Sequence, residues 1–338
     1  MIRKLIWLVI AVFFAGTCTA GLLYLHLTSW ANRPIGKIEL EKLFTVHPGQ
    51  GLKRTAIALE QEGLITDAFR FTVLARLNKK EKLIKAGEYF ISTAMTPNEI
   101  LGQMVEGRVH LYRLTIPEGF NLAQIAAAVA TAGLDSETNF LDTARKPETA
   151  RSLGIDADTL EGYLIPDTYY FPLGLDSGTI IATMVKQFRT AFKPAWEQRA
   201  AELGMSLHEV VTLASIIEKE TGDPRERPII ASVFHNRLEK GMRLETDPTV
   251  IYGIPDFDGR IRRQHLDTVT PYNTYKIKGL PPGPIASPGA LALEAVLYPA
   301  TTDYLFFVSK NDGTHQFSVT FKEHNAAVQI HQLGKSKP

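Results

Sequence analysis

The 338-residue sequence contains one cysteine, Cys18, so an intramolecular disulfide bond is excluded. Its nine histidines form no His-Glu-x-x-His motif and no Cys/His pairing, which argues against a metal site. There is no glycine-rich phosphate-binding loop, and Ser215 lacks the Gly-x-Ser-x-Gly turn of serine hydrolases. A formal net charge of +1 gives no broad basic field, so nucleic acid is not an expected partner. No cofactor is predicted.

One long uncharged run lies at the N-terminus. Arg3 and Lys4 precede residues 5–31, which are enough to cross the ~30 Å hydrocarbon core of a bilayer as a single helix. The basic residues place the N-terminal side in the cytoplasm. A cleaved signal peptide, with residues 18–20 as a weak cleavage site, is the alternative, but its apolar region would be shorter. The sequence predicts a single-pass inner-membrane anchor at 1–33, with the rest periplasmic.

Residues 34–134 contain one pattern twice, at a constant offset. Residues 45–49 and 115–119 are each followed by an alanine-containing stretch and a Gly-Leu pair. Each copy predicts a short strand, a glycine turn and an amphipathic helix. Between the copies, residues 87–91 predict a strand, and Thr96 is expected to cap a helix that begins at Pro97. The first copy resembles the LysM sugar-binding module, although such a strand-turn-helix is also a common scaffold without a ligand.

The stretch at residues 206–253 is the one best suited to chemistry. Ser206 and Glu209 predict a capping box at the start of a helix that Gly222 ends. Glu218 and Glu220, near its C-terminus, point roughly 200° apart and cannot share one site. A carboxyl group near the negative end of a helix dipole, partly desolvated by neighbours, has a raised pKa, which suits a general acid.

The two faces of this helix differ. Glu218 shares its face with small side chains, which are expected to let a bulky ligand approach the backbone. Glu220 shares its face with apolar side chains, which are expected to be packed. The first face carries Val211, Ala214 and Ser215, and the second carries Leu213, Ile216 and Ile217. One carboxylate is expected to act and the other to support it; the alternative is that residues 218–220 form a solvated helix end.

The segments after this helix are rich in loops. A second helix is predicted at 227–240, with Gly241 as its stop. Residues 243–249, 271–275 and 279–289 combine proline, amides and aromatic rings, as a sugar-binding groove requires. The tyrosines at 163–170 either line such a groove or belong to the core. Asn311-Asp312-Gly313 between two apolar runs predicts a β-hairpin.

Four motifs carry a resemblance to a known family: ASIIEKET (214–221), RLETDPTVIYG (243–253), YNTY (272–275) and LPPGPIASPG (280–289). On these, the chain resembles the endolytic murein transglycosylase (YceG-like) family over most of its length. The predicted fold is α+β: a transmembrane helix, a LysM-like strand-helix subdomain, and a mixed α/β catalytic domain at 135–338. The resemblance implies cleavage of the bond between N-acetylmuramic acid and N-acetylglucosamine within peptidoglycan strands, leaving 1,6-anhydro ends.

The resemblance also implies a single catalytic glutamate, at Glu218 in this sequence. Penicillin-binding glycan synthases are implied as partners beside the glycan strands. The expected supporting or substrate-binding residues are Glu220, Ser215, Glu245, Thr246, Asp247, Tyr252, Tyr272, Asn273 and Tyr275. Two alternatives stay open: a lysozyme-type muramidase, in which Asp247 or Glu245 is a second carboxylate and water attacks, and a non-catalytic peptidoglycan-binding scaffold.

Overall fold

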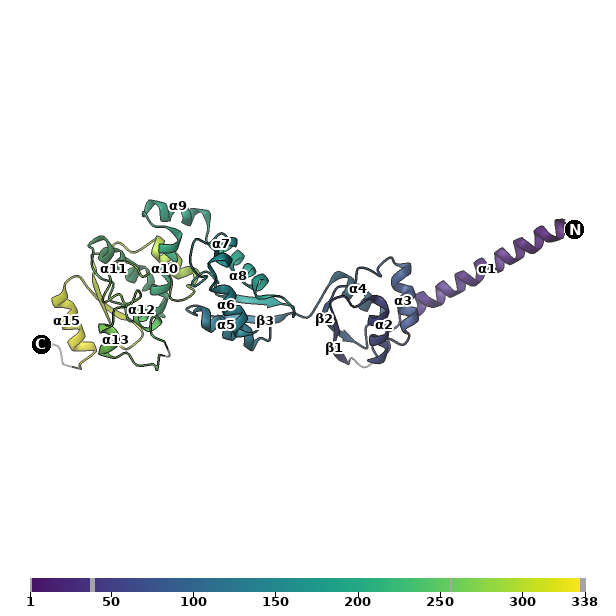
Figure 1. Ribbon diagram of the computed structural model, residues 1–338, viewed down its shortest axis with the longest axis horizontal. Coiled ribbons are helices and arrows are strands. Elements are labelled where there is room, and N and C mark those ends of the chain that lie inside the picture. Colours follow the sequence, from purple (N-terminus) through teal and green to yellow (C-terminus); the bar gives the residue numbers. More distant parts are fainter. Residues whose placement is uncertain (1, 37–39, 256, 335–338) are drawn as a thin grey trace. The chain divides into compact units, whose positions relative to one another are not determined.

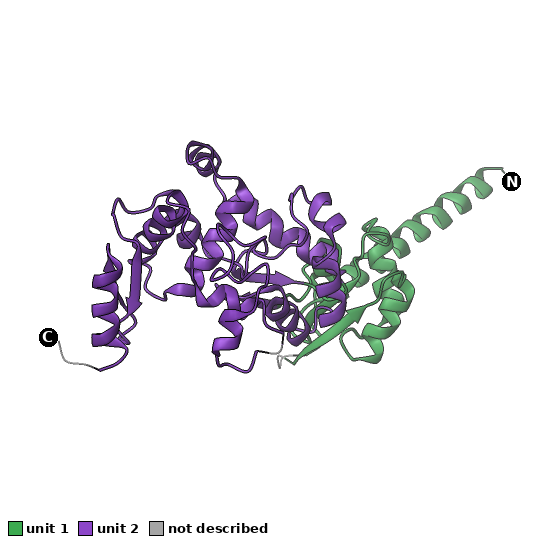
Figure 2. Ribbon diagram, turned by 60° about the vertical axis from the view of Figure 1, so that its left-hand side comes forward, with its two compact units in different colours: residues 1–112, 172–174 green, residues 113–171, 175–338 purple. Residues whose placement is uncertain are grey.

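The computed structural model describes residues 2–36, 40–255 and 257–334 (Figure 1). The chain divides into two compact units, one of residues 1–112 with 172–174 and one of residues 113–171 with 175–338 (Figure 2). Helices dominate both units, and the strands of the described residues form three two-stranded sheets. The predicted α+β class is therefore confirmed.

The smaller unit begins with α1 (Ile2–Ala31), a 30-residue helix whose most apolar 18-residue window has a mean hydropathy of 2.2. At 1.5 Å per residue, this helix is about 45 Å long. It is followed by β1 (Glu41–Val46), α2 (Leu52–Gln61), α3 (Ala68–Leu77), β2 (Gly87–Ser92) and α4 (Pro97–Glu106). The two strands are antiparallel, with Glu41 opposite Ser92. As predicted, Thr96 caps α4 in a capping box with Glu99, and Pro97 is its first residue.

The internal repeat is confirmed at the level of local structure. Its second copy contains β3 (Tyr112–Ile116) and α5 (Leu122–Thr131). The turn glycines have nearly equal φ values, +76° at Gly49 and +77° at Gly119, in the left-handed region where glycine is favoured. The predicted boundary after residue 134 differs from the observed division, because β3 pairs with β4 (Asp167–Phe171) and α5 packs on α6 (Glu137–Ala144) in the larger unit. The LysM-like character of 34–134 stays a prediction.

The larger unit is organised around α10 (Leu207–Glu220). Its residues from Val210 to Ile217 are all buried, and it packs on α9, α11, α12 and α14. The predicted capping box of Ser206 and Glu209 is present, and the helix ends two residues before Gly222. The other elements are α7 (Pro147–Ser152), α8 (Ser177–Ala191), α9 (Pro194–Glu202), α11 (Arg227–Glu239), α12 (Asp247–Tyr252), α13 (Arg263–Asp267), α14 (Ala290–Leu297), β5 (Phe306–Ser309), β6 (His315–Ser318) and α15 (Phe321–His331). The β5–β6 pair is the predicted hairpin.

One glycine contact in this unit gives a test of its packing. Gly162 has φ +84°, and a Cβ atom there would lie 2.5 Å from Cβ of Pro284 and 3.0 Å from Cγ1 of Val211. Gly204 has φ +68° but nothing within 4 Å. Both Gly→Ala variants should incur backbone strain of about 1–2 kcal/mol. Only Gly162→Ala adds overpacking of about 1–3 kcal/mol, so urea unfolding should show the larger loss there; equal losses would contradict the close approach.

Candidate active site

The last turn of α10 presents Glu218 and Glu220 to separate surroundings. Glu218 accepts hydrogen bonds from Arg227 and from the backbone N–H of Gly289, whereas Glu220 accepts one from Thr246. The two carboxylates therefore share none of these partners. This confirms the prediction, from helix geometry, that they cannot serve one site.

Glu218 is part of a buried ion pair. Its Oε1 lies 2.7 Å from Nη2 of Arg227, and both side chains are 5% exposed. Its Oε2 accepts the N–H of Gly289 at 3.0 Å. Burial raises the pKa of Glu218, while the N–H of Gly289 and the charge of Arg227 act in the opposite direction. Both oxygens are thus engaged by donors that stabilise the ionised form.

The helix face that carries Glu218 is covered by a loop. Ser215 is fully buried, donates to the carbonyl of Thr212 at 2.7 Å and accepts the N–H of Ile285 at 3.0 Å. Residues 285–289 therefore lie along the small residues of this face. The prediction that this face admits a bulky ligand is wrong, because the loop fills the space. The hydrogen bond from Ile285 to Ser215 holds this loop against α10.

Two residues beside Glu218 were not predicted. Glu118, 47% exposed, has its Oε2 3.3 Å from Nη2 of Arg227. Nε and Nη1 of Arg227 are buried without a hydrogen-bond partner among the described residues. The signal available for Glu118 was a departure from the internal repeat, since the equivalent position of the first copy is Pro48. Arg227 had no comparable signal.

Glu220 lines a cavity of about 390 Å³ at the C-terminal end of α10. The hydroxyl of Thr246 donates to Oε1 of Glu220. Four of the predicted supporting residues line the same cavity: Glu245, Thr246, Asp247 and Tyr275. The rest of the wall is Arg237, Leu244, Phe306, Phe307, Val308, Phe321, His324 and Val328. The structure thus brings residues of three sequence motifs together around one carboxyl group.

The environment of Glu220 suits proton exchange. Burial raises the pKa of Glu220 to about 7; the hydroxyl of Thr246 opposes the rise and the charge of Asp247 adds to it. Asp247 in turn accepts a hydrogen bond from the hydroxyl of Tyr275 at 2.9 Å. A carboxyl group with a pKa near 7 is protonated often enough to donate and ionised often enough to accept a proton at neutral pH.

Arg237 shapes the segment that carries Thr246 and Asp247. Its Nη1 donates to the carbonyls of Arg243 at 3.0 Å and Leu244 at 2.9 Å, and lies 3.3 Å from the carboxylate of Glu245. Glu245 has φ +54°, a left-handed conformation that a non-glycine residue rarely adopts. The bonds from Arg237 offset this strain and fix the turn toward Glu220.

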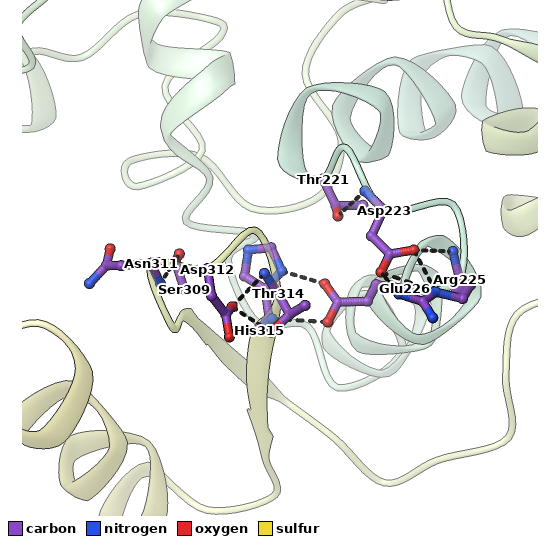
Figure 3. A network of polar contacts seen from close by, with 9 residues as sticks. All are labelled: Thr221, Asp223, Arg225, Glu226, Ser309, Asn311, Asp312, Thr314 and His315. Atoms are coloured by element: carbon purple, nitrogen blue, oxygen red, sulfur yellow. Dashed lines mark hydrogen bonds and ion pairs between the residues drawn. The ribbon is translucent and has the colours of Figure 1, made fainter.

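The β5–β6 hairpin supplies another wall of the Glu220 cavity and is tied to the α10–α11 connection. The backbone N–H of His315 donates to one oxygen of Glu226 at 2.9 Å, and Nδ1 of the same histidine lies 2.6 Å from the other oxygen (Figure 3). In the same connection, the N–H of Asp223 donates to the hydroxyl of Thr221 at 3.0 Å. The hairpin is therefore positioned against the end of α10.

Tyr252 and Tyr272 belong to a different site. The hydroxyl of Tyr252 donates to Glu161 at 3.0 Å, and its ring centroid lies 4.9 Å from that of Tyr272. Tyr272 and Glu161 line a cavity of about 330 Å³ together with His208, in the first turn of α10. With a rise of 1.5 Å per residue, His208 and Glu220 are about 18 Å apart along the helix. These tyrosines are not brought to either helix carboxylate.

Asn273 stabilises the loop of residues 265–275 by hydrogen bonds. It is 1% exposed, and its Nδ2 donates to the carbonyls of His265, Leu266 and Thr268 at 3.1, 3.1 and 2.6 Å. Its Oδ1 accepts the N–H of Tyr275 at 3.0 Å. Asn273 thus holds the loop from which Tyr275 reaches Asp247.

Comparison with known proteins places the chain among relatives. The model of the YceG-like family matches residues 44–330. An endolytic murein transglycosylase of Bacillus subtilis is 37% identical over 273 residues, 75% of this chain and 74% of the relative. One of Streptococcus pneumoniae serotype 2 is 28% identical over 319 residues, but the match spans only 58% of that relative.

A solved structure agrees with these sequence matches. The 2.6 Å crystal structure of a putative yceG-like protein from Listeria monocytogenes is 35% identical, with a TM-score of 0.59, over 84% of this chain and 98% of that one. The family model covers well over half of the sequence. The chain therefore belongs to the YceG-like family.

Proposed function

We propose that this protein is a membrane-anchored endolytic murein transglycosylase that cuts within the glycan strands of peptidoglycan. Family membership and the names of the relatives support the activity. The apolar α1, with Arg3 and Lys4 at its amino end, supports an inner-membrane anchor and a periplasmic location of the remaining chain. The observation that carries the proposal is the cavity in which Glu220, Asp247 and Tyr275 meet.

We assign the proton transfer to Glu220 rather than to Glu218, on which the resemblance placed it. Glu220 lines a cavity and has a pKa of about 7. Glu218 is held between Arg227 and the N–H of Gly289, and the 285–289 loop covers its face. A general acid must reach the substrate oxygen and give up its proton, and the surroundings of Glu220 favour both.

The proposed reaction needs one carboxyl group acting twice. Protonated Glu220 donates to the oxygen between N-acetylmuramic acid and N-acetylglucosamine as the bond from C1 to that oxygen breaks, which releases the 4-hydroxyl of N-acetylglucosamine. The Glu220 carboxylate then takes the proton of the muramyl 6-hydroxyl, whose oxygen attacks C1 and closes the 1,6-anhydro ring. The negative charge of Asp247, in the same cavity, stabilises positive charge developing at C1. Glu220 ends protonated, and no water is consumed.

Analysis of products by mass spectrometry tests this proposal. Purified peptidoglycan digested by the full chain should yield internal fragments with 1,6-anhydro ends. Reducing ends would instead establish a lysozyme-type muramidase, for which Asp247 is placed in the same cavity as Glu220. If the folded protein does not cleave peptidoglycan, the remaining alternative is a non-catalytic peptidoglycan-binding scaffold.

The pH dependence of the reaction rate should follow the protonation of Glu220. Since the group must start protonated, the rate should fall as the pH rises through about 7. Asp247→Asn removes a charge that raises the pKa of Glu220, so the midpoint of this fall should move to lower pH. Thr246→Val removes a donor that lowers this pKa, so the midpoint should move to higher pH. Midpoints that moved in the same direction would contradict Glu220 as the titrating group.

We further propose that the LysM-like region at 34–134 contacts glycan and that penicillin-binding glycan synthases are partners at the membrane. Both proposals rest on the resemblance alone. Deleting residues 38–107, of which 38–39 lie outside the described residues, should weaken processing of insoluble sacculi but not the cleavage chemistry. Full-rate processing of sacculi by the folded deletion variant would exclude a binding role.

A further inference from the structure

Helix α3 of the smaller unit is apolar on two faces. One face is buried in the core and carries Ala68, Phe71, Leu74 and Ala75. The other face carries Phe69, Val73 and Leu77, at the i, i+4, i+8 spacing that aligns side chains along a helix. Phe69 is 77% exposed and Leu77 is 58% exposed. Val73, between them, is partly buried against the core, so the exposed part of this face consists of Phe69 and Leu77. Large exposed apolar side chains on one helix face indicate contact with a partner or a membrane.

The outward face of α3 borders a groove that it shares with α1. The groove has a volume of about 750 Å³, and its α1 side is formed by Ala20, Leu23, Tyr24, His26 and Leu27. Its α3 side is mostly apolar, and the two charged residues in it, Asp67 and Arg70, form an ion pair with each other. The two helices are joined within one unit, because Nε1 of Trp30 donates to Thr66 just before α3 at 2.7 Å and because Leu27 and Ala31 are buried in the unit's core. Figure 1 shows α3 beside the base of α1, which projects from the unit.

The groove begins at the level where α1 leaves the hydrocarbon core of the bilayer. If the ~30 Å hydrocarbon core takes the 20 residues that follow Lys4, its outer edge lies at Tyr24. Tyrosine is enriched at that level of membrane proteins. Ala20 and Leu23 are then surrounded by lipid, and Phe69 and Leu77, which line the same groove, lie at the outer interface.

Basic residues accompany Phe69 and Leu77. Arg70 and Arg76 on α3 form ion pairs with Asp67 at 3.1 Å and Glu81 at 3.3 Å, whereas Lys79, Lys80 and Lys82 follow α3 and form no ion pair with any of the described residues. Helices that lie in a membrane interface combine an apolar face with lysine and arginine, which attract anionic headgroups. The three lysines therefore complement a phospholipid surface.

We propose that α3 lies in the outer membrane interface, with Phe69 and Leu77 in contact with lipid and with a phospholipid acyl chain in the groove between α3 and α1. The proposal rests on the membrane span of the proposed function and is independent of the cleavage chemistry. It gives the smaller unit a fixed orientation on the membrane, with the two-stranded β1–β2 sheet directed away from it.

Nitroxide depth measurements on the full chain test this arrangement. In a Cys18→Ser background, which removes the only native cysteine, labels are attached through Phe69→Cys, Leu43→Cys and Ile10→Cys. Leu43 is the matched control because it is an exposed apolar residue, 42% accessible, on β1. Ile10 is the reference within the span. The protein is reconstituted in vesicles of phosphatidylethanolamine and phosphatidylglycerol, and relaxation by oxygen is compared with relaxation by a water-soluble nickel chelate.

The proposal predicts that oxygen dominates at positions 69 and 10 and that nickel dominates at position 43. Nickel dominance at position 69, with oxygen dominance at position 10, would overturn it. Dipolar broadening at position 69 would overturn the lipid occupant, because a second copy would then fill the groove. Nickel dominance at position 10 would overturn the proposal together with the anchor, while leaving the cleavage chemistry untouched. If Phe69→Cys fails to fold by circular dichroism, Leu77→Cys makes the same test.

Discussion

Glu220→Gln should abolish turnover, whereas Glu218→Gln should retain most of it in the folded protein. Glutamine keeps the size of the side chain but cannot exchange a proton. Positioned general acid–base catalysis contributes typically ~10²–10⁴-fold, and Glu220 is proposed to act in both steps, so the loss should reach the upper part of that range. Release of anhydro-ended fragments from purified peptidoglycan, at a temperature where both variants are folded, measures the difference.

Unfolding experiments give the same pair of variants a second readout. The pKa of Glu220 rises from 4.5 to about 7 on folding, so the folded state binds the proton more tightly. The stability that this tighter binding contributes is present below pH 4.5 and is lost as the pH rises through 7, by roughly 3 kcal/mol in total. Glu220→Gln should therefore be more stable relative to wild type at pH 8 than at pH 4. If Glu220→Gln is active and Glu218→Gln is inactive, the assignment to Glu220 is wrong and Glu218 is the catalytic residue.

Arg227→Met should produce the largest loss of stability among these variants, about 3–5 kcal/mol at pH 8. The substitution leaves the Glu218 carboxylate in a site where both partners are 5% exposed, without its compensating charge. Because burial already raises the pKa of Glu218, the group should protonate as the pH falls, and the loss should be smaller at pH 5. Urea unfolding at both pH values measures this dependence.

Arg225→Met is the matched control for Arg227→Met. Arg225 also pairs with a carboxylate, Asp223 at 2.8 Å, but its side chain is 86% exposed. Exposed pairs contribute about 0–1 kcal/mol, so this variant should be nearly as stable as wild type. Adding Glu218→Gln to Arg227→Met should recover part of the lost stability, because no buried charge then remains at position 218. Equal losses for the two arginine variants would contradict the buried ion pair.

Features set by local chemistry could be predicted from the sequence. The capping box at Ser206 and Glu209, the stop at Gly241 and the Asn311–Gly313 hairpin depend on residues a few positions apart. The opposite facing of Glu218 and Glu220 follows from 100° per residue. Each of these predictions was confirmed.

Which of the two carboxylates lines a cavity could not be predicted, because it depends on segments distant in sequence. Ile285, seventy positions beyond Ser215, brings a loop onto the face of Glu218. Leu213, Ile216 and Ile217, which share the face of Glu220, are packed as predicted. The β5–β6 hairpin and α15, further still along the chain, add a cavity at Glu220 itself. Helix periodicity distinguishes two faces but carries no information on what covers each one.

The participation of α15 in the cavity has a consequence for biosynthesis. Phe321, His324 and Val328 come from α15 and line the same cavity as Glu220. In the proposed topology, α15 crosses the membrane after α1 and α10, because it follows both in the sequence. A chain whose α15 has not yet crossed is therefore already tethered to the membrane by α1, while the Glu220 cavity still lacks one wall. If Glu220 transfers the proton as proposed, glycan cleavage begins only after α15 has crossed.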